Sequence, residues 1–70
     1  MMPLYLAEMG TESIIRHVGG NPEMKKHLEC MGFVPGGAVT VLSTIGGNLI
    51  VKVKESRVAV SREMAAKIMV

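Results

Sequence analysis

Residues 27–37 read His-Leu-Glu-Cys-Met-Gly-Phe-Val-Pro-Gly-Gly, a segment that predicts the end of a helix followed by a tight turn. Gly32 supplies the left-handed backbone conformation that ends many helices, and Phe33 just beyond it can fold back on Leu28. Pro35 prevents the helix from continuing, and the glycines after it turn the chain. The expected structural residues of this stop are Gly32, Pro35 and Gly36.

The same helix has a clear beginning six residues before this segment. Asn21 is a good N-cap, because its side-chain oxygen can accept a hydrogen bond from a free amide of the first turn. Pro22 suits the first helical position, where a missing N–H costs nothing. The sequence therefore predicts a helix over residues 21–31 with one apolar stripe. The residues of this stripe are Met24, Leu28 and Met31.

Short strands are expected on both sides of the helix. Segments rich in β-branched or alternating residues lie between Gly-containing turns, at 12–18, 38–45, 49–54, 57–60 and 67–70. The residues expected to face the core are Leu49, Val51, Val53, Val58 and Val60. The alternation in 12–18 is imperfect and leaves its inner face open. We therefore predict a mainly β fold, a small barrel of about five short strands with one α-helix inserted after the first.

The length of 70 residues predicts one domain spanning 1–70. An apolar lead-in is expected to dock on this domain through Met2, Leu4, Leu6 and Met9, and Ser61 can cap a brief turn of helix over 62–66. The net charge of +2 is mild and its basic residues are dispersed. No signal-peptide pattern and no apolar run of about 18 residues is present, so we expect a cytoplasmic protein that does not insert into a membrane.

Catalysis has little support in this sequence. It contains no Asp and no Gly-x-Ser-x-Gly motif, and Cys30 is its one cysteine. A nucleophile pair of Cys30 and His27 would have helix side chains that point outward in parallel, without a third group to orient them. We therefore expect a protein that is not an enzyme.

A transition-metal site is an alternative function. His27 and Cys30 lie one helical turn apart, and Glu23 precedes His27 by another turn. Imidazole and thiolate suit Fe(II) or Zn(II), although two or three ligands on one helix do not make a closed tetrahedral site. The competing interpretation is that Cys30 is a small buried hydrophobe and that no cofactor is required.

A nucleic-acid partner is not expected. The basic residues Lys52, Lys54 and Arg57 could line one strand face, but single-stranded nucleic acids also require aromatic stacking surfaces. Tyr5 and Phe33 are the only aromatic residues in the chain.

A protein-interaction module fits the sequence best, because apolar residues remain outside the predicted core. The expected docking residues are Met31, Phe33, Val34 and Pro35 at the helix stop, together with Leu42 and Ile50 on the outer strand faces. Met9 could extend this patch.

Residues 28–36 resemble the L-x-x-[LM]-G-[LF]-x-P-G signature of the ferrous iron transport protein A (FeoA) family. The flanks are similar too, with Pro3-Leu4 in the lead-in and Gly19-Gly20 after the first strand, so the resemblance covers essentially the whole chain. It implies an SH3-like β-barrel in the cytoplasm. It also implies an accessory protein of ferrous iron uptake, with a membrane ferrous iron permease that carries a cytosolic GTP-binding domain as its partner. The oligomeric state is left open.

Overall fold

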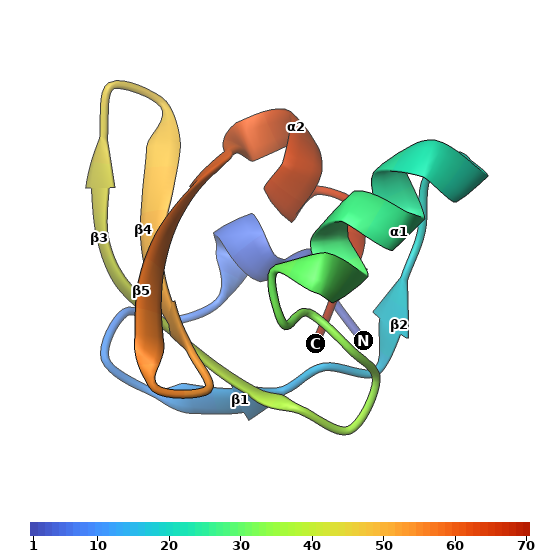
Figure 1. Cartoon of the computed structure of the whole chain (residues 1–70). Helices are drawn as coiled ribbons and strands as arrows, with labels where there is room; N and C mark the ends of the chain where they lie inside the picture. Colours follow the sequence, from blue (N-terminus) through green and yellow to red (C-terminus); the bar gives the residue numbers. More distant parts are fainter.

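Six short strands form two antiparallel sheets around one hydrophobic core (Figure 1). This computed structural model describes all of residues 1–70. The larger sheet has the strand order β1-β3-β4-β5, and the smaller sheet pairs β2 with β6. The elements are the 3₁₀ turn η1 (Leu4–Leu6), β1 (Glu12–Ile14), β2 (His17–Val18), α1 (Pro22–Cys30), β3 (Ala38–Ile45), β4 (Asn48–Val53), β5 (Ser56–Ser61), α2 (Arg62–Ala65) and β6 (Ile68–Met69). The predicted mainly β barrel with one principal helix is confirmed.

The predicted strand over 12–18 is two strands that belong to different sheets. The Ile15 amide donates to the Gly37 carbonyl and the Arg16 amide donates to the Met69 carbonyl, each at 2.8 Å. The chain therefore changes sheets between these two residues. This corner brings both Ile15 and Val18 into the core, a spacing of three that explains the imperfect alternation. It also raises the strand count from the expected five to six.

Helix α1 begins and ends where the sequence predicts. The Asn21 Oδ1 accepts a hydrogen bond from the Met24 amide at 2.8 Å. At the other end, the Gly32 amide donates to the Glu29 carbonyl and the Phe33 amide to the Leu28 carbonyl, each at 3.0 Å. This pair of bonds is the Schellman motif, and it requires the positive φ of +105° at Gly32.

Two tight hairpins connect β3, β4 and β5. Gly46 and Gly47 both have positive φ, as a two-residue type I′ turn requires. The register changes between Val41 and Ser43, so Leu42 is the extra residue of a β-bulge on β3. Before the bulge Val41 faces the core opposite Val51, whereas beyond it Ser43 lies opposite Ile50. Beyond Leu42, the side chains of β3 therefore no longer follow the inward–outward alternation of the first half of the strand.

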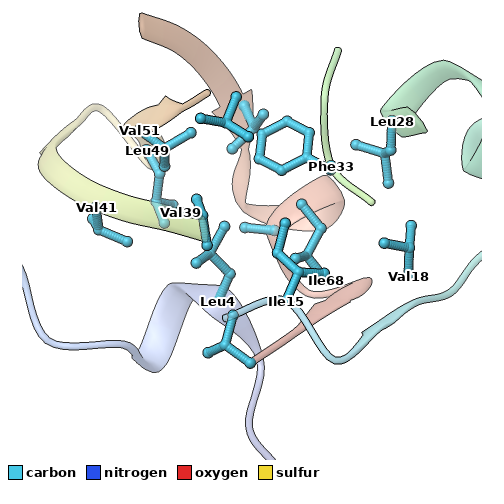
Figure 2. Packing of buried hydrophobic residues seen from close by; sticks show 14 residues of the cluster. Leu4, Ile15, Val18, Leu28, Phe33, Val39, Val41, Leu49, Val51 and Ile68 are labelled. Carbon is cyan, nitrogen blue, oxygen red and sulfur yellow. The ribbon is translucent and has the colours of Figure 1, made fainter. Parts of the chain in front are cut away.

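Phe33 lies at the centre of the core, between Leu28 of α1 and the aliphatic residues of the strands (Figure 2). All fourteen buried side chains are hydrophobic: Leu4, Ile15, Val18, Leu28, Phe33, Val39, Val41, Leu49, Val51, Val53, Val60, Ala65, Ile68 and Val70. The inward positions predicted for β4 are confirmed. On β5, Val60 is buried, whereas Val58 is only partly buried.

The two ends of the chain lie side by side (Figure 1). Met2 and Val70 exchange backbone hydrogen bonds of 2.8 Å in both directions. The lead-in residues expected to dock are Met2, Leu4, Leu6 and Met9. Only Leu4 is buried, and the other three are exposed. Between β5 and β6, Ser61 caps α2 as predicted, accepting from the Met64 amide at 3.1 Å.

Candidate functional site

The predicted docking surface at the helix stop is smaller than expected. Phe33 is 0% exposed, so the prediction that its side chain contacts a partner is wrong. The Schellman motif directs this ring inward against Leu28, which also excludes it from the surface. Met31 and Val34 are partly buried, and only Pro35 is well exposed. The helix stop is therefore chiefly a structural feature.

The second half of the predicted surface lies on β3 and β4. Leu42 is the extra residue of the bulge and is 36% exposed. Ile50 lies on the outer face between Ser43 of β3 and Ala59 of β5, and its side chain is partly covered. Leu42 is therefore the more accessible of the two.

Further exposed aliphatic side chains lie on the β3–β4 hairpin and on the segment that precedes β1. Leu6 is 60% exposed, Met9 57% and Ile45 64%. The Gly10 amide donates to the Val41 carbonyl at 2.9 Å, which brings the backbone next to Met9 alongside β3, and Leu6 lines the same groove as Thr44 of β3. We call Leu6, Met9, Leu42 and Ile45 the hairpin patch. Sequence reasoning missed Leu6 and Ile45, since lead-in residues were expected to dock and the bulge carries no clear sequence signal.

A groove of about 350 Å³ adjoins the hairpin patch and shares Leu6 with it. Residues of η1, of the β3–β4 hairpin and of α2 line this groove: Tyr5, Leu6, Thr44, Gly47, Leu49 and Arg62. The Arg62 guanidinium lies over the Tyr5 ring, 4.9 Å from its centroid, which is a cation–π contact. The groove therefore combines an apolar wall with one positive charge.

The predicted metal ligands are only partly brought together. Glu23 and His27 line one cleft of about 390 Å³, together with Asn21, Met24 and Met64. Cys30 is exposed rather than buried, and it does not line this cleft. No group of three or more His, Cys, Asp or Glu side chains is arranged to hold a metal ion. The three-ligand set of Glu23, His27 and Cys30 is therefore not assembled.

Of the three basic residues considered for nucleic-acid binding, Lys52 and Arg57 lie on β4 and β5, and Lys54 lies in the turn between these strands. Lys52 is the cross-strand neighbour of Arg57, and Lys52 and Lys54 line a cleft of about 200 Å³ together with Glu12. Neither aromatic ring lies there, because Phe33 is buried and Tyr5 belongs to the groove beside α2. This part of the larger sheet thus lacks the stacking surface that single-stranded nucleic acids require.

A family model for the FeoA domain matches residues 2–70. The chain belongs to the FeoA domain family. A curated relative, the putative Fe(2+) transport protein A of Methanocaldococcus jannaschii, is 33% identical over 70 residues, which is all of this chain and 85% of that protein. The predicted family resemblance is confirmed.

Two FeoA crystal structures share the fold. The FeoA of Stenotrophomonas maltophilia, crystallised with zinc and described as an SH3 domain protein, is 25% identical with a TM-score of 0.84, over 99% of this chain and 88% of that one. An iron uptake regulatory protein (FeoA) is also 25% identical, with a TM-score of 0.87, over 96% of this chain and 91% of that one. The predicted SH3-like barrel is confirmed.

Membership of this family makes the chain a non-enzymatic accessory protein of ferrous iron transport. In this structure neither helix has the length or the apolar character needed to cross a bilayer. The surfaces available for that accessory role are the hairpin patch, the groove beside it and the cleft at the start of α1.

Proposed function

We propose that this protein is a cytoplasmic interaction module that docks on the cytosolic GTP-binding domain of a membrane ferrous iron permease. The observation that carries the proposal is the hairpin patch, which exposes four aliphatic side chains from two adjacent segments. Clustered exposed apolar residues on a small domain mark interaction surfaces, because a chain gains nothing by leaving them in water.

The position of the patch suits docking without a change in fold. Leu42 and Ile45 are held by the bulge and by the type I′ turn of a hairpin that projects away from α1 (Figure 1). The core beneath is filled by Leu49 and Val41, so these exposed residues have no interior position to return to. A contact of this extent buries less than about 1,200 Å², which is typical of transient complexes.

An amide-shift titration tests the proposal. The ¹⁵N-labelled protein is titrated with the purified cytosolic domain of the permease, in its GDP-bound and GTP-bound forms. We expect the largest shifts at Leu6, Met9, Leu42 and Ile45. Shifts confined to the far side of the barrel around α1, or no shifts with either nucleotide, would contradict the proposal.

A second candidate function is metal binding at the start of α1. The observation that favours it is that Glu23 and His27, four residues apart on one helix, line the same cleft. A carboxylate and an imidazole at this spacing can both reach one Fe(II) or Zn(II) ion, leaving water in the other positions. The zinc complex of the Stenotrophomonas maltophilia protein makes zinc a suitable first probe.

A further inference from the structure

Arg62 occupies an unusual position for a surface arginine. It is the first residue of α2, directly after the Ser61 cap, and its guanidinium is stacked over Tyr5 of η1. Tyr5 is itself partly buried against the core, so its ring is a fixed support. The arginine head therefore lies on the rim of the groove, stacked on Tyr5.

The charge of Arg62 is available to a ligand. Its guanidinium forms no salt bridge within the chain, and stacking uses only the flat face of the group. The N–H donors of a guanidinium lie along its edges, and their spacing matches the two oxygens of a carboxylate. A carboxylate at this edge would form a bidentate pair at little cost in side-chain entropy, because the cation is already positioned.

The wall beside this charge is apolar. Leu49 forms part of the groove and continues into the core, while Leu6 also lines the groove and is mostly exposed. Gly47 leaves the end of the groove open, since a Cβ atom there would meet nothing within 4 Å. A volume of about 350 Å³ accommodates one aliphatic side chain with its backbone.

We propose that this groove binds an extended segment of a partner protein in which an aliphatic residue is followed by a Glu or Asp. The aliphatic side chain lies between Leu6 and Leu49, and the carboxylate pairs with Arg62. This inference rests on the proposed docking function and adds the chemistry of the recognised segment. A single stacked arginine beside an apolar wall suits one acidic side chain, whereas an anionic membrane surface attracts clusters of basic residues.

Short capped peptides test this inference without the permease. The ¹⁵N-labelled full chain is titrated with Ac-Ala-Leu-Glu-Ala-NH₂ and, as the matched control, Ac-Ala-Leu-Gln-Ala-NH₂. We expect saturable millimolar binding with shifts at Tyr5, Leu6, Thr44 and Gly47, and about threefold tighter binding of the Glu peptide, as for a partly exposed ion pair. Equal affinity for the two peptides, shifts outside the groove, or no saturable binding would overturn the inference.

Two variants locate the effect. Arg62→Gln should abolish the preference for the Glu peptide, whereas Arg57→Gln, which removes an exposed charge on the outer sheet face, should retain it. A preference that survives Arg62→Gln would overturn the assignment of the carboxylate to Arg62. Leu6→Ala should weaken the binding of both peptides equally. Thermal unfolding of each variant confirms that the variant is folded.

The outcomes separate this inference from the proposed function. If the permease domain leaves the hairpin patch unshifted while the Glu peptide binds the groove preferentially, the docking proposal fails and the groove specificity stands. If the permease domain shifts the hairpin patch but the peptides bind equally, docking stands and the groove specificity fails.

Discussion

The backbone amide of Phe33 donates to the carbonyl oxygen of Leu28 at 3.0 Å, and both side chains are fully buried. One turn of chain thus ends the helix and inserts the only core aromatic ring. The hydrogen bond that ends α1 and the packing of Phe33 in the core therefore depend on the same backbone reversal. Gly32, between the two residues, makes the reversal sterically accessible.

Gly32→Val should therefore destabilise the protein by more than about 1 kcal/mol, since a β-branched residue is strained at a φ of +105°. A Cβ alone would fit, because the nearest atom to it would lie at an ordinary 3.5 Å. Urea unfolding followed by circular dichroism measures the loss. Gly32→Asn, which tolerates positive φ better, should lose less, and equal stability of Gly32→Val and wild type would refute the Schellman assignment.

Phe33→Ala should cost about 3–5 kcal/mol, because the ring fills the middle of a core with few other large side chains. A domain this small has little stability in reserve, so most of the variant should be unfolded at room temperature. Phe33→Leu keeps most of the volume and should remain folded. A Phe33→Leu protein that folds yet loses permease binding would show that the ring is a contact residue after all.

Asn21→Ala should lower the free energy of unfolding by about 1 kcal/mol, since it removes the side-chain oxygen that accepts from the Met24 amide at 2.8 Å. Asn21→Ser restores an acceptor at the N-cap and should recover most of the loss. The measurement is again the free energy of unfolding in urea. If the Ala and Ser variants are equally stable, the cap does not contribute as the geometry indicates.

Metal binding at the start of α1 should depend on His27 and not on Cys30. Anaerobic titration calorimetry with Zn(II) and with Fe(II) should show weak binding to the wild-type protein. The affinity should fall at least about tenfold in His27→Ala. It should not change in Cys30→Ser, because Cys30 lies outside the cleft. Binding that falls in Cys30→Ser would place the metal elsewhere on α1. Identical binding by all three proteins would remove this site as a candidate.

The helix and the hairpins were predictable because their signals are local. The Asn21 cap, the Gly32 stop and the alternation in 49–54 each act over a few residues, and the structure confirms all three. The division of residues 12–18 into two strands was not predictable, because it depends on hydrogen bonds to the distant Gly37 and Met69. A corner between sheets is a tertiary feature that no local pattern encodes.

The docking surface was less predictable than the fold. Leu42 was expected on the surface, and the structure confirms this. Ile45 is exposed because of the β-bulge that precedes it, and Leu6 because of the path of the lead-in segment. Phe33 was assigned both to the helix stop and to the surface, and one side chain cannot serve both. The hydrophobic contact that completes the Schellman motif decides in favour of the core.

The most direct test of the docking proposal compares two exposed isoleucines on opposite parts of the larger sheet. Ile45 belongs to the hairpin patch and is 64% exposed, whereas Ile14 is 48% exposed on β1 beside Ala38. Calorimetric titration of the permease's cytosolic domain should give at least about tenfold weaker binding for Ile45→Glu, since burying an unpaired carboxylate in an apolar contact is costly. Binding by Ile14→Glu should equal that of wild type. Equal affinities for the two variants would contradict the account.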